Sequence, residues 1–264
     1  MNSLSIPYNK RTYAIEYVDF PATVADRPPL VLLHEGLGCV AMWRDFPEKL
    51  AAATGCRVVA YSRPGYGASD PYPDARQADY MHREGQDILP AVLAALGLEQ
   101  PVLIGHSDGG SIALIFAGTT PQALRAAVVM APHEFVEEET LAGIRAARDL
   151  WESSDWPKKL ARYHKYAPRV FADWNDCWLS PPFRHWNIED FLPAISCPLL
   201  AIQGCDDEYA TLRQIEVIAE KAGQGAQLLK LENCGHSPQR DQEAAVLAAI
   251  TEFVAAQASR SAGE

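Results

Sequence analysis

A serine, two aspartates and a histidine stand in an order that suits nucleophilic catalysis. Ser107 lies in "GHSDGG", residues 105–110, directly after an apolar run. Asp206 and Asp207 follow a second apolar run, "PLLAIQG", and His236 follows a third, "AQLLKLE". A serine hydroxyl becomes an effective nucleophile when a histidine removes its proton and a carboxylate orients that histidine. These residue types therefore predict acyl transfer through a covalent serine intermediate.

The G-x-S-x-G pattern around Ser107 stands where a strand should turn sharply into a helix. The strand-like run "PVLIGH" precedes it, and the segment "GSIALIFAG" with helical spacing follows. Glycines permit a turn that is too tight for side chains, and such a turn lifts the serine hydroxyl clear of the sheet. We predict Ser107 as the nucleophile, His236 as the base and Asp207 as the orienting acid, with Asp206 as the fallback.

The elements that must position these residues alternate between short apolar runs and helix-like segments. The runs are continuously hydrophobic, which is typical of parallel strands buried on both faces. The carboxyl ends of parallel strands meet at one edge of a sheet, where ligands of such folds bind. A more alternating stretch, residues 11–20, predicts an antiparallel edge strand. Parallel strands are expected at residues 29–34, 56–62, 101–106, 126–131, 198–204 and 226–232.

One segment, residues 137–196, contains no strand-like run but holds five of the six tryptophans. We predict a helical cap, or lid, inserted between two late strands, with residues 1–136 and 197–264 forming the main domain. Most of the rings should be structural, because buried aromatics usually belong to a core, while some line a pocket. The residues predicted to line that pocket are Glu35, Leu37, His133, Phe135, Trp151 and Trp178.

Four separated motifs resemble those of the α/β-hydrolase fold superfamily, in its serine-dependent esterase-like branch. They are "HEGLG", "SRPGYGAS", "GHSDGG" and "GCDDEYA…GHSP", within about residues 28–256. The resemblance implies an α/β fold with a mostly parallel sheet flanked by helices. The family's acid is usually the fourth residue of a G-x-x-D loop, which counted from Gly204 gives Asp207.

The resemblance also assigns an oxyanion hole. Relatives with a His-Gly-x loop carry an aromatic residue nine positions after the His, as Trp43 stands after His34. No insertion is needed, so Glu35 replaces the usual glycine and Gly36 takes the donor position. The implied donors are the backbone N–H groups of Gly36 and Asp108.

The "HEGLG" stretch has two other interpretations. A zinc-binding H-E-x-x-H helix would need a histidine at position 38, which is glycine, and a helix where a strand is expected. A dinucleotide-binding G-x-G-x-x-A turn leaves the serine, acid and histidine unexplained. For Glu35 we expect pairing with Arg63 or another nearby base. The alternative is an acidic pocket rim, formed together with Asp108 and Glu134, that favours uncharged or amine-bearing substrates over anions.

Composition narrows the class of protein and its partners. The formal net charge is −11, with 48% hydrophobic and 22% charged residues, so nucleic acid and acidic membranes are poor partners. The N-terminal sequence has no apolar signal-like region, and no stretch approaches the roughly 20 apolar residues of a membrane span. Six cysteines without C-x-x-C pairing indicate buried reduced thiols in a cytoplasmic protein. A small-molecule substrate is expected, with homodimer formation left open.

The resemblance implies a serine hydrolase that cleaves a small-to-medium carboxylic ester through an acyl-enzyme, with no cofactor and no metal. Serine at the turn argues against haloalkane dehalogenases and epoxide hydrolases, which carry aspartate there. Thioesterase, lactonase and carbon–carbon bond hydrolase activity stay open, although Ser237 stands where the last group usually has tryptophan. A ligand-binding receptor with little turnover is the alternative from another class, since fold alone does not name the substrate.

Overall fold

A single mixed sheet forms the centre of the computed structural model, which describes residues 1–72 and 74–260, the last three of these by backbone alone. Within that part of the chain, eight strands follow the order β1-β2-β4-β3-β5-β6-β7-β8. The first two pairings are antiparallel, and the remaining five are parallel. The strands are β1 (Asn2–Tyr8), β2 (Arg11–Phe20), β3 (Leu30–Leu33), β4 (Val58–Tyr61), β5 (Val102–His106), β6 (Ala126–Met130), β7 (Leu199–Gly204) and β8 (Gln227–Leu231).

All six predicted parallel strands are present, and each is somewhat shorter than its apolar run. The expected antiparallel strand is also present as β2, but the prediction that it forms the edge is wrong. β1 pairs with β2 along its whole length and takes the edge instead. In β1 only Ile6 is fully buried, with Leu4 and Tyr8 partly buried against the same core, so the alternation that marks the strand is short.

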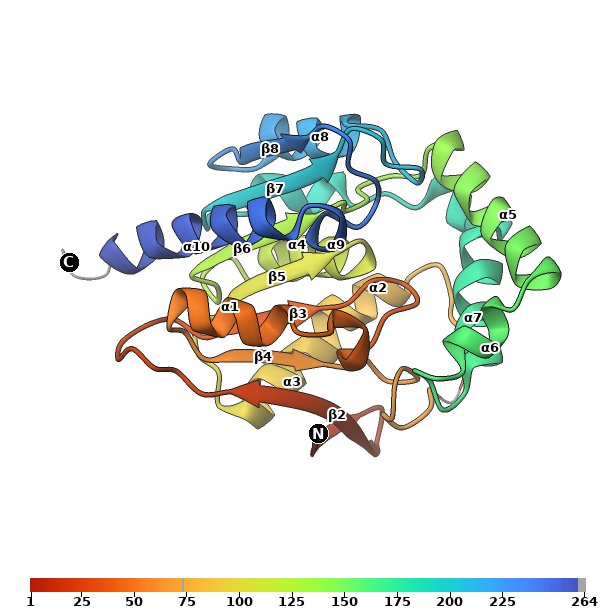
Figure 1. Ribbon diagram of the computed structural model, residues 1–264, viewed down its shortest axis with the longest axis horizontal. Helices are drawn as coiled ribbons and strands as arrows, with labels where there is room; N and C mark the ends of the chain where they lie inside the picture. Colours follow the sequence, from red (N-terminus) through yellow and green to blue (C-terminus); the bar gives the residue numbers. More distant parts are fainter. Residues whose placement is uncertain (73, 261–264) are drawn as a thin grey trace.

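Helices cover both faces of the sheet, as Figure 1 shows. Side chains of a strand alternate between the two faces, so Leu30 and Leu32 pack on one side and Val31 and Leu33 on the other. The first side carries α1 (Phe46–Thr54) and α10 (Glu243–Arg260), with α9 (Pro238–Asp241) against α10. The second side carries α2 (Tyr80–Arg83), η2 (Glu84–Ile88), α3 (Leu89–Leu96), α4 (Asp108–Thr119) and α8 (Arg213–Lys221).

The helix that precedes β5 has an irregular turn in front of its proline. The sequence predicts a kink or a late start at Pro90, and η2, which has π-helical hydrogen bonding, lies between α2 and α3 there. Proline lacks an N–H and clashes with the preceding turn, which a wider π turn accommodates. The C-terminal helix α10 is also present; the rest of the predicted frayed tail, residues 261–264, lies outside the described residues.

The chain leaves the sheet after β6 and returns at β7. In between lie helices and an isolated bridge from Phe135 to Asn187, which matches the prediction of a helical insertion between two late strands. Whether residues 137–196 form a separate domain or lid stays a prediction. The helices are α5 (Glu138–Ser153), α6 (Trp156–Leu160), α7 (Ala167–Trp178), η3 (Pro181–His185) and η4 (Glu189–Ala194); a further short helix, η1 (Val40–Trp43), follows β3.

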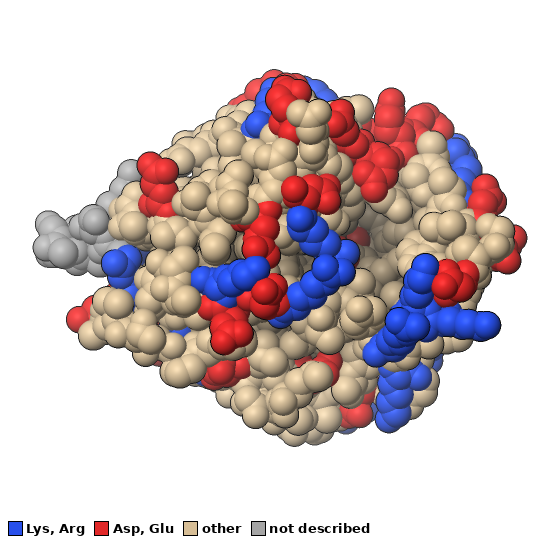
Figure 2. Space-filling view, in the orientation of Figure 1, with Lys and Arg blue, Asp and Glu red and all other residues tan. Residues whose placement is uncertain are grey.

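The lobe formed by α5, α6 and α7 stands at one end of the sheet (Figure 1). Figure 2 shows acidic and basic side chains interspersed over this face, with a hollow between the lobe and the body of the sheet. Across the described residues, no helix combines the length and the apolar character that crossing a bilayer requires. The six cysteines are free thiols, and all except Cys205 are buried.

Candidate active site

Ser107 stands at the turn between β5 and α4, in a strained backbone conformation. Its φ is 53° and its ψ is −119°, a region that non-glycine residues rarely occupy. The turn closes tightly, since a Cβ on Gly105 would lie 2.2 Å from the Gly109 carbonyl oxygen, and one on Gly109 would lie 2.0 Å from the Leu33 carbonyl oxygen. Both flanking glycines are therefore required by the close packing of backbone against backbone.

The structure brings Ser107, His236 and Asp207 together at the carboxyl ends of β5, β8 and β7. His236 Nε2 lies 2.9 Å from Ser107 Oγ. On the other side of the ring, His236 Nδ1 lies 2.8 and 3.0 Å from the two carboxylate oxygens of Asp207. A ring that donates from Nδ1 to a carboxylate presents the Nε2 lone pair to the hydroxyl, which is the arrangement a general base needs.

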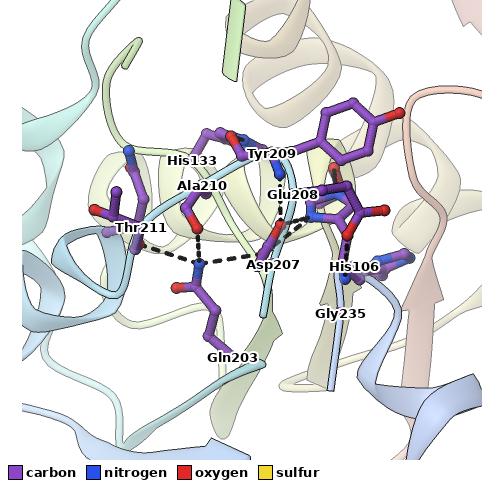
Figure 3. Close-up of polar contacts among 12 residues, drawn as sticks. His106, His133, Gln203, Asp207, Glu208, Tyr209, Ala210, Thr211 and Gly235 are labelled. Carbon is purple, nitrogen blue, oxygen red and sulfur yellow. Dashed lines mark hydrogen bonds and ion pairs between the residues drawn. The ribbon is translucent and has the colours of Figure 1, made fainter. Parts of the chain in front are cut away.

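Asp207 is held by several donors besides the histidine, as Figure 3 shows. The Tyr209 N–H donates to Oδ1 at 2.9 Å, and Gln203 Nε2 donates to Oδ2 at 3.2 Å. Burial acts to raise the pKa of Asp207, but the charge and hydrogen bond of His236 lower it on balance. Burial acts to lower the pKa of His236, and the Asp207 carboxylate raises it on balance. The two groups therefore stabilise each other's charged form.

Two backbone N–H groups near Ser107 are free to receive a negatively charged oxygen. Asp108 is the first residue of α4, where an N–H has no partner within the helix. The Gly36 N–H makes no hydrogen bond to any residue that the structure describes. A Cβ on Gly36 would come within 2.4 Å of Trp174 Nε1, so the loop and α7 can pack this closely because residue 36 is glycine.

A small apolar cavity of about 100 Å³ opens onto the serine and histidine. Of the predicted pocket residues, Glu35, Leu37, His133 and Trp178 line it. A larger surface hollow of about 580 Å³ lies between residues 75–83 and α7 and contains none of the three residues. We regard the smaller cavity as the candidate site because the reactive groups face it. Its lining is Glu35, Gly36, Leu37, Ser107, Asp108, His133, Thr140, Ile144, Trp156, Trp174, Trp178, Tyr209 and His236.

The prediction that Phe135 and Trp151 line the pocket is wrong. The backbone of Phe135 bridges to Asn187, and its side chain packs into the core. Trp151 stacks on Phe171 with ring centroids 4.1 Å apart and planes 5° apart. It lies seven residues beyond Ile144 on α5, about 10 Å further along the helix, which takes it past the cavity.

Several lining residues were not predicted from the sequence. Trp174 stands four residues before the predicted Trp178 on α7, and the unpredicted Thr140 and Ile144 are four apart on α5, so each pair shares one helix face. That spacing was a usable signal for which faces point inward. Trp156 begins α6 and Tyr209 lies in the loop after β7, and no local pattern reveals that these two segments meet at the cavity.

The three carboxylates predicted to form an acidic rim have different surroundings. Glu134 is fully buried, lies outside the cavity lining, and has its pKa raised by burial and by neighbouring acids. Asp108 is also buried, and its Oδ2 accepts from the Tyr80 hydroxyl at 2.6 Å and lies 3.4 Å from Arg63 Nη2. The prediction of an acidic rim built by all three carboxylates is therefore wrong, since only Glu35 is partly exposed.

The sequence predicts that Glu35 pairs with Arg63 or another nearby base, and the structure places other bases, not Arg63, beside its carboxylate. It lies 3.6 Å from His106 Nδ1 and 3.7 Å from Arg240 Nη2. Burial acts to raise the pKa of Glu35, but His106 and Arg240 hold it well below its usual range. Glu35 is therefore a charged group of the cavity wall that is partly compensated by basic neighbours.

His133 contributes a neutral ring to the cavity wall. Burial, followed by the nearby His236, lowers its pKa to about 4. Its ring stands edge-on to Trp178 with centroids 5.1 Å apart, and its backbone is fixed by Ser111, whose hydroxyl bonds both the N–H and the carbonyl of His133. Among the described residues no group of three His, Cys, Asp or Glu side chains is arranged to hold a metal ion.

Comparison with known proteins agrees with this architecture. The family model described as the alpha/beta hydrolase fold matches residues 28–167, which is 140 of the 264 residues. The chain belongs to the α/β-hydrolase fold family. Within this family the turn at Ser107 corresponds to the nucleophile elbow, the strained strand-to-helix turn that exposes the reactive side chain.

Individual relatives are more distant. Serine hydrolase BPHL of Mus musculus is 30% identical over 170 residues, 62% of this chain and 58% of its own length. The 2-hydroxymuconate semialdehyde hydrolase of Pseudomonas sp. (strain CF600) is 27% identical over 251 residues, covering 86% of this chain and 87% of that protein. A solved thermophilic esterase from Thermogutta terrifontis, with malate bound, has a TM-score of 0.71 at 22% identity, covering 97% of this chain and 98% of that one. The chain spans a little over half the length of the BPHL proteins it matches.

Proposed function

We propose that this protein is a serine hydrolase that cleaves a compact carboxylic ester through an acyl-enzyme intermediate. The observation that carries the proposal is the continuous chain of hydrogen bonds from Ser107 Oγ through His236 to Asp207, at 2.9 and 2.8 Å. Ser107 and His236 open onto a cavity whose wall includes two backbone N–H groups that have no hydrogen-bond partner among the described residues. Nucleophile, base, orienting acid and oxyanion donors then occur in one place, as acyl transfer requires.

In the first half-reaction, Ser107 Oγ attacks the carbonyl carbon of the ester. The hydroxyl proton passes to His236 Nε2, and the resulting imidazolium is stabilised by Asp207. The carbonyl oxygen becomes an oxyanion that receives hydrogen bonds from the N–H groups of Gly36 and Asp108. The tetrahedral intermediate then collapses, the carbon–oxygen bond to the alcohol breaks, and His236 returns its proton to the departing alkoxide.

In the second half-reaction, water replaces the alcohol. His236 takes a proton from the water as it attacks the acyl carbon, and the same backbone donors stabilise the second oxyanion. Collapse of this intermediate breaks the bond to Ser107, whose oxygen regains a proton from His236. The products are a carboxylic acid and an alcohol. Ser107, His236 and Asp207 have returned to their starting protonation states, and the cycle needs no cofactor.

The cavity favours a small apolar or aromatic acyl group. Its wall includes three indole rings together with Leu37 and Ile144, and its volume is about 100 Å³. Apolar pockets of this kind bind ligands by burial, with a few polar groups that set orientation. The wall is largely apolar and the chain has a formal net charge of −11, so both desolvation and the long-range field act against a free carboxylate on the substrate. We therefore expect neutral or amine-bearing esters to react faster than esters with a free carboxylate.

A substrate panel tests the proposed function. Esters, thioesters, lactones and a carbon–carbon bond substrate, each with small apolar acyl groups, are offered to the wild type and to Ser107→Ala. We expect the ester to have the highest kcat/KM and the variant to have none above background. A higher kcat/KM for the thioester, lactone or carbon–carbon substrate would replace the ester in the proposal. A wild type that turns over none of them but binds a ligand in the cavity would favour the receptor alternative.

A further inference from the structure

Arg63 is a buried cation that the catalytic scheme above does not use. It follows β4 and is fully shielded from solvent. Its closest carboxylate is Asp108, 3.4 Å away, and its Nη1 atom has no partner among the described residues. Burying an arginine costs several kcal/mol of desolvation, which a single carboxylate offsets only in part. Such a group calls for an explanation beyond pairing of charges.

The guanidinium contacts the peptide that carries one oxyanion donor. Arg63 Nη2 donates to the Glu35 carbonyl oxygen at 2.9 Å. His34 Nδ1, at 2.7 Å, and the Gly38 N–H, at 3.0 Å, donate to the same oxygen. In a planar trans peptide the N–H of the next residue points opposite to the carbonyl. Three donors on the Glu35 carbonyl therefore hold the Gly36 N–H in one direction.

The second oxyanion donor is linked to the same cation. Nη2, the atom that binds the Glu35 carbonyl, also lies 3.4 Å from Oδ2 of Asp108, whose N–H is the other proposed donor. The backbone N–H of Arg63 in turn donates to His34 Nε2 at 3.1 Å. Burial and Arg63 hold the pKa of His34 well below its usual value, so the ring is neutral and can accept there while donating from Nδ1.

We infer that Arg63 is a positioning residue of the oxyanion hole. Its guanidinium fixes the orientation of the Glu35–Gly36 peptide relative to the Asp108 side chain. The inference rests on the proposed function and extends it. A cation on a carbonyl also polarises the peptide, which strengthens the N–H as a donor. Because the effect acts on the tetrahedral intermediate, removing the guanidinium should lower kcat more than it changes KM.

A matched control exists within the same buried cluster. Arg76 also lies over the Tyr66 ring, and the guanidinium carbons of Arg63 and Arg76 are each 4.7 Å from the ring centre. Arg76 is paired with the buried Glu84 at 3.3 Å and donates to the Pro64 carbonyl, and it contacts neither Glu35 nor the serine turn. Replacing Arg76 therefore disturbs a comparable buried charge without touching the oxyanion donors.

The experiment compares the wild type with Arg63→Met, Arg63→Lys and Arg76→Met. Three quantities are measured: kcat and KM for the best ester, the inhibition constant of a boronic acid that forms a tetrahedral adduct with Ser107, and the thermal midpoint. Loss of one oxyanion donor costs on the order of 100-fold in kcat. We expect Arg63→Met to lose about that factor in kcat and in boronate affinity, with KM within about threefold of wild type. Arg76→Met should lower the thermal midpoint but keep kcat within about threefold.

A folded Arg63→Met protein with wild-type kcat would overturn the inference, and so would an Arg76→Met protein that loses kcat to the same extent. If the Arg63→Met protein does not fold, the kcat of the Arg63→Lys protein tests the role of Arg63 instead. A single ammonium on a shorter reach cannot replace the planar fork, so kcat should fall at least about tenfold. Unchanged kcat in a folded lysine variant also contradicts the role of Arg63. A wild type without turnover or boronate binding contradicts the proposed function instead.

Discussion

Asp206 and Asp207 are neighbours in the chain, but one is exposed and the other has a fully buried carboxylate. The loop after β7 turns Asp207 toward His236 and surrounds it with donors from Tyr209 and Gln203. Asp206 makes no side-chain hydrogen bond to any described residue. The structure places Asp207, the residue indicated by the G-x-x-D loop, against His236, and leaves Asp206 exposed.

Replacing the two aspartates one at a time tests the role of the acid. An amide at position 207 cannot stabilise the imidazolium and can favour the wrong tautomer of His236, so Asp207→Asn should lower kcat about ten-thousandfold. Asp206→Asn should leave kcat within about twofold, as for other exposed polar substitutions. Steady-state kinetics on the same ester provides both values. Equal and mild effects would show that the acid lies elsewhere.

The mutual stabilisation of Asp207 and His236 also predicts a pH profile. His236 acts as a base, so it must be neutral, and Asp207 raises its pKa above the ordinary value of about 6.5. We expect kcat/KM to rise with pH to a plateau, with its midpoint above that value. In the weakly active Asp207→Asn variant the raising charge is gone, so the midpoint should move down. A wild-type midpoint at or below the ordinary value would contradict the pairing.

At the scale of elements, α5 and α7 each supply two side chains of the cavity onto which Ser107 opens. Thr140 and Ile144 line the cavity from α5, while Leu141, on the same helix and also buried, does not. The helix therefore offers a matched pair of aliphatic side chains that differ in whether they contact a bound acyl group. This allows the effect of packing to be separated from the effect of substrate fit.

Truncating these two side chains should separate specificity from stability. Both Ile144→Ala and Leu141→Ala should reduce the free energy of unfolding by roughly 2–5 kcal/mol, the usual cost of such core substitutions. Only Ile144→Ala enlarges the acyl site, so only it should raise the kcat/KM ratio of a bulkier to a smaller acyl ester, by about tenfold. A similar change of ratio in both variants would mean that α5 does not form the acyl wall.

The sequence predicted the elements best where a local pattern decides them. Five of the six predicted parallel strands are buried along their whole length and read as continuous apolar runs. The sixth, β8, was located from its run as well, although only Leu231 in it is buried. β1, whose alternation of Leu4, Ile6 and Tyr8 is short and includes Pro7, was not predicted. Trp151 was misplaced because composition shows that tryptophans gather in this segment, while their positions along α5 and α7 decide which rings reach the cavity.

At the scale of the whole molecule, long-range pairings were the least predictable feature. Arg63 follows β4 and Asp108 follows β5, and their contact arises because both strands flank β3 in the sheet. Glu35 pairs with Arg240, which lies 205 positions later in the chain. Neither pairing is marked by a local sequence pattern. The sequence therefore identified the acidic residues but not the arginines that neutralise their charge.

The overall charge of −11 predicts a measurable effect on anionic substrates. Glu35 and Asp108 each have a basic neighbour, so repulsion should come mainly from the long-range field, which salt screens over about 30 Å at 0.01 M and 8 Å at 0.15 M. We expect kcat/KM for an ester with a free carboxylate to be several-fold below that of its neutral analogue at low salt. The gap should narrow as salt is added. An anionic ester that reacts equally well at low salt would contradict this.

The most direct test of the account is the reactivity of Ser107 itself. A fluorophosphonate probe bonds covalently to a serine whose hydroxyl is activated by a neighbouring base. The account predicts one label per wild-type chain, located on Ser107 by peptide mass spectrometry. It also predicts no label on a folded Ser107→Ala protein, since losing the nucleophile costs on the order of a millionfold. Labelling of that variant at a comparable rate, or an unlabelled wild type, would contradict the central claim.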